Sequence, residues 1–224
     1  IQPLFFDARS PWGSPAGAAT LSALVPPTLS VLETFAAHAN RSGMPAAPDA
    51  ARHLILTQFI TADAPGGGVG SNALYYARDN EGAATVSELR RALGDAATRE
   101  LFAVAPELAA AAPPFTAVNK TSPGAFASEA FRAALDGALG DGGGAAAGST
   151  LVITGVETDY CVAATALAAL DAGYYVVLIT DALASSRPNS GQAMLDFLYR
   201  RFDHQLRFAT SAEFHDVLLG QRHR

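Results

Sequence analysis

Short β-rich runs alternate with segments of helical period from residue 53 to the end of the chain. This alternation is typical of βαβ units, because parallel strands are joined by long crossover connections that are usually helical. Most of the runs are apolar at successive positions, as strands are when helices cover both faces of their sheet. The predicted strands are 53–59, 115–119, 150–154, 175–180 and 205–209. The sequence therefore predicts an α/β fold of three layers, with a doubly wound, mostly parallel, Rossmann-like sheet.

Helical periodicity between these runs predicts helices at about 28–41, 86–93, 127–138, 160–172, 189–202 and 211–219. Thr28 is placed to cap the first of these, and Gly43 follows its carboxyl end. The Gly-rich stretch 140–149 precedes a strand instead of joining a strand to a helix, so we interpret it as a surface loop and not as a phosphate-binding loop.

Composition limits the class of protein. Half of the 224 residues are hydrophobic and only 16% are charged, which predicts one ordered domain over residues 1–224. A net charge of −6 argues against nucleic acid as a partner. No apolar run is long enough for a transmembrane helix and no signal peptide is visible, so we expect no membrane partner. The single cysteine excludes an internal disulfide, and we expect a cytoplasmic protein.

Cys161, the single cysteine, follows a predicted strand, Gly155 and a short turn, and it lies at the start of a predicted helix. The free N–H groups and the dipole at such a place favour a thiolate. This position is also the carboxyl edge of a parallel sheet, where ligands bind in such folds. Two interpretations follow from the residues: Cys161 is a nucleophile, or it is a small apolar group in the core.

Lys120 directly follows the predicted strand 115–119 and should emerge at the same edge of the sheet as Cys161. A cation within several Å of a thiol lowers the pKa of that thiol. The alternative is a solvated lysine at the start of a loop. Together Lys120 and Cys161 form a candidate site.

Three motifs carry a family resemblance: GVETDYCV at 155–162, VNKTSPGAF at 118–126 and SPW at 10–12. The chain resembles the isochorismatase-like cysteine hydrolases, and SPW resembles a metal-free subgroup of that family. The resemblance implies hydrolysis of a C–N bond through a thioester, in a small carboxamide, carbamoyl or ureide substrate. It implies catalytic roles for Cys161 and Lys120, an oxyanion hole formed by the amides of Glu157 and Cys161, and a cis peptide bond between Val156 and Glu157.

The family also uses an aspartate at the end of its first strand. By the family pattern this aspartate would lie immediately before Ile1, and we expect the first strand upstream of the sequence given. Asp7 is not at the motif position, and we interpret it as a surface residue. Without that aspartate, the chain would be a catalytically inactive small-molecule binding or assembly module. A third hypothesis is an isochorismatase-type ether hydrolase, although those relatives lack the cysteine.

Neither a metal nor another cofactor is expected. Metal-holding relatives have histidines directly after the second strand of the fold, whereas the segment directly after the run 53–59 contains no histidine here. The five histidines show no ligand spacing, and we interpret each as a surface or packing residue. The resemblance also suggests a homo-oligomer, a dimer or tetramer. For the walls of the substrate pocket we predict residues near strand ends, namely Gln2, Phe5, Trp12, Phe59, Tyr76 and Tyr160.

Overall fold

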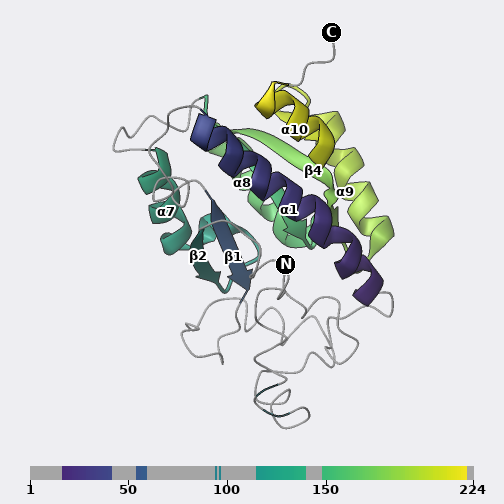
Figure 1. Ribbon diagram of the computed structural model, residues 1–224. Helices are drawn as coiled ribbons and strands as arrows, with labels where there is room; N and C mark the ends of the chain where they lie inside the picture. The colour runs from purple at the N-terminus through teal and green to yellow at the C-terminus, as the bar shows by residue number, and fades with distance from the viewer. Residues whose placement is uncertain are drawn as a thin grey trace.

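Parallel strands covered by helices on both faces form the frame of the protein (Figure 1). The structure, a computed structural model, describes residues 17–41, 54–59, 94, 96, 115–139 and 148–220. Two strands pair as one sheet, β1 (Ile55–Phe59) and β2 (Thr116–Lys120). Three strands form a second sheet in chain order, β3 (Thr150–Val156), β4 (Tyr175–Ala184) and β5 (Leu206–Ala209). Each of the five predicted strands is present, and the predicted α/β class is confirmed.

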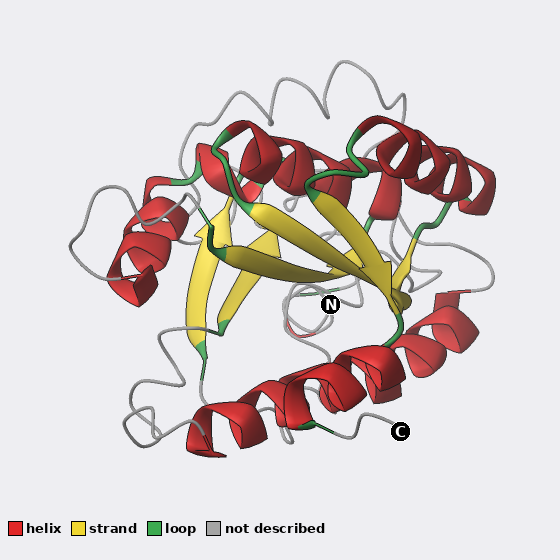
Figure 2. Cartoon of the chain, turned by 90° about the horizontal axis from the view of Figure 1, so that it is seen from above, coloured by secondary structure: helices red, strands yellow, loops and turns green. Residues whose placement is uncertain are grey.

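The helices form the two outer layers, as Figure 2 shows from above. One layer contains α1 (Gly17–Arg41) and α10 (Ser211–Leu219), and the other contains α7 (Glu129–Leu139), α8 (Ala163–Asp171) and α9 (Pro188–Arg201). Strand β4 explains why both faces are covered, because successive residues of a strand point to opposite faces. Leu178 belongs to the apolar cluster that includes Ala166 of α8, whereas Ile179 belongs to the cluster that includes Val31 of α1.

Helix α1 begins eleven residues earlier than the predicted start at residue 28, at Gly17, and it contains Pro26 and Pro27. The expected cap at Thr28 is wrong, because Thr28 lies inside the helix and is buried. Two interior prolines oppose a helix, at about 3 kcal/mol each. They are tolerated because an inward-facing stripe runs through them at helical spacing, Leu24, Thr28, Val31 and Thr34, all buried.

The bounds of the other predicted helices agree closely with the structure in three cases and are corrected in one. The predictions 127–138, 189–202 and 211–219 correspond to α7, α9 and α10. The prediction 160–172 is corrected, because this segment divides into a π-helical turn, η3 (Thr158–Val162), and α8. The predicted helix 86–93 and most of the predicted loop 140–149 lie outside the described residues. None of the helices described is both long and apolar enough to cross a membrane.

The sheet differs from the single sheet that the sequence predicts. In the described part of the chain, β1 is paired only with β2 and β3 only with β4, so an edge of β1 and an edge of β3 have no partner strand. A cavity of about 340 Å³ lies there, and residues of β1, β3 and α1 line it. Its walls include Leu56, Ile153 and Val31, which makes it largely apolar.

Candidate active site

Cys161 lies in a wide turn at the carboxyl end of β3. The strand has an irregular register between Ile153 and Gly155, and Gly155 has a φ of +118°, which an L side chain rarely adopts. The Val156–Glu157 peptide bond that follows is cis, at the bond where the family resemblance implied it. The turn η3 then winds around the Glu157 carbonyl, which accepts hydrogen bonds from the N–H groups of Tyr160 and Val162 at 3.1 and 3.0 Å. Cys161 therefore lies inside a π-helical turn, which corrects the prediction that it lies at the start of an α-helix.

Lys120 ends β2 and is buried, so its interpretation as a solvated lysine is wrong. Its Nζ atom donates hydrogen bonds to the carbonyl oxygens of Ser122 and Pro123, both at 2.8 Å, and lies 3.6 Å from the Cys161 sulfur. The two carbonyls hold the ammonium group in place. The predicted meeting of Lys120 and Cys161 at one edge of the fold is confirmed.

A second link joins the loop after β2 to the cysteine turn. The Thr165 hydroxyl donates to the Cys161 carbonyl at 2.7 Å and accepts from the Ala125 N–H at 3.0 Å. The two segments also approach each other at Gly124, where a Cβ atom would lie at van der Waals distance, 3.4 Å, from the Ala164 carbonyl oxygen. Thr165 was not among the site residues predicted from the sequence. Its signal is a threonine four residues after Cys161 on a helix, the spacing at which a hydroxyl can bind the preceding turn.

Burial dominates the electrostatics of the site. It raises the pKa of the Cys161 thiol, while the ammonium of Lys120 and the hydrogen bond from it act in the opposite direction. Burial likewise lowers the pKa of Lys120, and the adjacent Cys161 raises it. The sequence-based expectation of a lowered thiol pKa is therefore wrong in direction. A chemical consequence follows, because a thiol with a raised pKa needs a base to remove its proton before it can attack.

The cavity between β1 and β3 reaches the candidate nucleophile, since Cys161 and Thr165 are among the residues that line it. Of the predicted pocket walls, only Tyr160 has a side chain within the described residues. Phe59 lies in β1, but its side chain is outside the described residues, as are Gln2, Phe5, Trp12 and Tyr76. Tyr160 does not line this cavity, and its hydroxyl oxygen is buried. Adjacent positions on a helical turn point in different directions, which explains why Tyr160 and Cys161 diverge.

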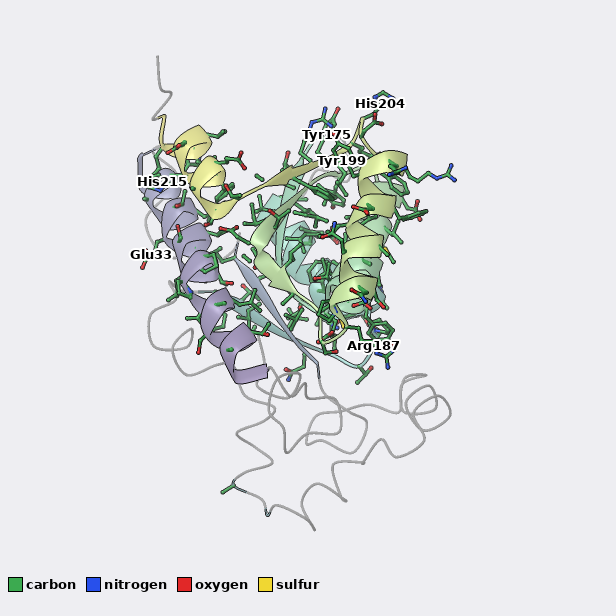
Figure 3. The ribbon with its side chains drawn as sticks, turned by 90° about the vertical axis from the view of Figure 1, so that its right-hand side faces the viewer. Glu33, Tyr175, Arg187, Tyr199, His204 and His215 are labelled. Carbon is green, nitrogen blue, oxygen red and sulfur yellow. The ribbon has the colours of Figure 1, made fainter. Side chains whose placement is uncertain are left out.

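The described histidines do not gather around this site. His38 and His215 join α1 to α10, through a 3.2 Å hydrogen bond from His38 to the Leu218 carbonyl and a 3.0 Å bond between His215 and Thr34. Figure 3 shows His215 beside α1. It also shows His204 far from Arg187, which follows the carboxyl end of β4. No group of three His, Cys, Asp or Glu side chains in the described ranges could hold a metal ion.

The fold and this geometry define a class, a doubly wound α/β protein with a buried cysteine–lysine pair where two parallel strands end. The chain belongs to the isochorismatase family of hydrolases, because the model of the isochorismatase domain matches residues 28–210. No protein of curated function matches the sequence.

Solved structures share the fold at low sequence identity. An isochorismatase-like hydrolase from Alkaliphilus metalliredigens is 19% identical with a TM-score of 0.60, over 97% of this chain and 94% of that one. A cysteine hydrolase from Pseudomonas syringae pv. phaseolicola 1448A is 16% identical with a TM-score of 0.65, over 99% and 90%. An N-carbamoylsarcosine amidase from Thermoplasma acidophilum is 20% identical with a TM-score of 0.56, over 92% and 90%. At these identities the likeness shows the fold alone.

Proposed function

We propose that the protein is a cysteine-dependent amidohydrolase that cleaves the C–N bond of a small carboxamide, carbamoyl or ureide compound. One observation carries this proposal: the Lys120 ammonium lies 3.6 Å from the Cys161 sulfur. A buried lysine is rare unless it is paired, so its burial beside the only cysteine of the chain favours a chemical role over a packing role.

In the proposed reaction, a base removes the thiol proton and Lys120 stabilises the resulting thiolate. The sulfur of Cys161 attacks the carbonyl carbon, and the backbone amides of Glu157 and Cys161 stabilise the oxyanion. The C–N bond breaks as the amine departs with the proton that the base received, which leaves a thioester. Water, deprotonated by the same base, then attacks the thioester, releases the acid and restores the thiol.

The base in this proposal is a carboxylate on a further strand, which lies between β1 and β3 and ends beside Cys161. Facing strand edges of a buried sheet are unfavourable unless their N–H and C=O groups are paired. The two edges, and the largely apolar cavity that β1 and β3 both line, support this placement. We propose, from the family pattern, that this carboxylate lies just before Ile1.

The substrate class has support from a structure of the same fold, which is an N-carbamoylsarcosine amidase and so acts on a carbamoyl compound. We also propose a metal-independent, cytoplasmic enzyme that assembles as a dimer or tetramer. The SPW motif at 10–12, on which the subgroup depends, lies outside the described residues.

The test is ammonia release from a panel of simple amides, carbamoyl compounds and ureides, with the chain extended by the residues that precede Ile1 in its gene. We expect release by the extended protein, and loss of release in its Cys161→Ala variant and in a variant with the upstream carboxylate replaced by its amide. Equal release by the Cys161→Ala variant would rule out the cysteine mechanism. An upstream sequence without an acidic residue would instead favour a binding or assembly module.

A further inference from the structure

Glu157 is the one acidic side chain that is buried among the described residues, and the proposed reaction uses only its backbone. A buried carboxylate is unfavourable unless hydrogen bonds compensate for the lost water. Its Oε2 atom accepts three such bonds, from the Ser186 N–H at 2.6 Å, the Ser186 hydroxyl at 2.9 Å and the Ser185 hydroxyl at 3.1 Å. The three bonds connect the cysteine turn to the loop between β4 and α9.

Ser185 divides its hydrogen bonding between two carboxylates. Its hydroxyl lies 2.5 Å from Oδ1 of Asp159, closer than it lies to Glu157, and it accepts from the Arg187 N–H at 3.0 Å. A hydroxyl has one proton, so Glu157 depends mainly on the two donors of Ser186. The loop is closely packed there, because a Cβ atom at Gly191 of α9 would lie only 3.0 Å from the Cβ of Ser185.

Anchoring Glu157 also anchors Cys161. The Glu157 carbonyl is the acceptor around which η3 winds, through the N–H groups of Tyr160 and Val162 on either side of Cys161. A shift of Glu157 would therefore move the sulfur relative to Lys120, which is held separately by two carbonyls of its own loop.

We infer that the Glu157 side chain is a positioning residue, which through Ser186 holds the cysteine turn so that the Cys161 sulfur stays beside the Lys120 ammonium. Its effect on turnover rests on the proposed function, whereas its effect on the thiol does not. The hydrogen bonds and the negative charge of Glu157 have opposite effects on the Cys161 thiolate. These hydrogen bonds hold the thiol near a cation, while the negative charge adds a smaller effect to that of burial in raising the pKa of Cys161.

Two substitutions separate these properties. Glu157→Gln keeps a carbonyl oxygen that can accept from Ser186 but removes the charge, so the thiol should titrate at the same pH as in the unchanged protein or lower. Glu157→Ala removes the anchor, so the thiol should leave Lys120 and titrate at least about one pH unit higher. The titration is followed by the ultraviolet absorbance of the thiolate, with the Cys161→Ala protein subtracted, because the chain has a single cysteine.

With a substrate from the amide panel, Glu157→Ala should lower kcat at least about tenfold with KM changed less than about threefold, and Glu157→Gln should recover most of that loss. The inference would be overturned if the Cys161 thiol of the Glu157→Ala protein titrated at the same pH as in the unchanged protein. Equal losses of kcat in Glu157→Ala and Glu157→Gln would also overturn it. If the thiol titrations follow expectation but no amide is hydrolysed, the positioning role stands and the proposed function fails.

A milder variant covers the case in which Glu157→Ala does not fold. Ser186→Ala removes the hydroxyl donor of Ser186 but leaves its N–H donor. The Cys161 thiol of this variant should therefore titrate at a higher pH, by less than about one pH unit. The matched control is Gln192→Ala on the exposed face of α9, where the Gln192 side chain donates to Asp196 in the same helix. Ser186→Ala and Gln192→Ala titrating alike would contradict the inference.

Discussion

The Nζ atom of Lys120 lies 3.6 Å from the Sγ atom of Cys161, a residue 41 positions away in the sequence. Lys120 ends β2 and Cys161 follows β3, and these strands belong to different sheets of the described structure. The two side chains meet because parallel strands end at one edge of the fold.

Replacement of Cys161 by alanine should abolish hydrolysis, because the alanine side chain cannot form a thioester. We expect a loss of at least about 10³-fold in kcat. Thermal unfolding should change little, since the substitution removes only one atom. A folded Cys161→Ala protein with normal turnover would contradict a covalent role.

Replacement of Lys120 by methionine should raise the pKa of the Cys161 thiol further, because the nearby cation that opposes the effect of burial is removed. The thiol should then titrate at a higher pH, and kcat at neutral pH should fall by about 10²-fold or more. The alkylation rate of the single cysteine against pH measures the shift. Arg200→Met, which removes an exposed cation in the last turn of α9, is the control and should leave the profile unchanged.

Replacement of Thr165 by valine tests the link between the loop after β2 and the cysteine turn. Valine keeps the shape but leaves the Ala125 N–H without its acceptor and the Cys161 carbonyl without its donor. We expect a loss of about 1–3 kcal/mol in the free energy of unfolding, measured in urea. Val217→Ala, at an exposed position of α10, should change it by less than about 0.5 kcal/mol. Similar unfolding curves for the two variants would show that this link is unimportant.

The start of α10 predicts a pH dependence of stability. Thr210 and Glu213 form a capping box, and hydrogen bonds from Thr210 hold the pKa of Glu213 below its ordinary value of 4.5. The ionised form is thus favoured in the folded protein, so its contribution is present above pH 4.5 and is lost as the pH falls through the lower, folded pKa. Glu213→Gln should remove that acid-side loss in thermal unfolding at a series of pH values.

The cap also makes a prediction at neutral pH. Thr210→Ala should cost about 1 kcal/mol in the free energy of unfolding. A Glu213→Gln protein whose stability falls as steeply with acid as that of the unchanged chain would exclude this source of pH dependence.

Local sequence patterns predicted much of the fold. The five strands were recognisable because a buried parallel strand is apolar on both faces, and α10 was recognisable from the helical period of its residues. The start of α1 was not predictable in the same way. Pro26 and Pro27 argue against a helix locally, and only the packing of Leu24 and Val31 into buried positions outweighs them.

By itself, the sequence determined the α/β class, the positions of the strands along the chain and the two residue types that meet at the candidate site. Only the tertiary structure decided how deeply Cys161 and Lys120 are buried, and therefore that the thiol pKa is raised and not lowered. It alone brought Thr165 to Ala125 and Glu157 to Ser186. The physical reason is range: strand and helix patterns arise from neighbours along the chain, whereas desolvation and hydrogen bonds between distant segments depend on how the whole chain packs.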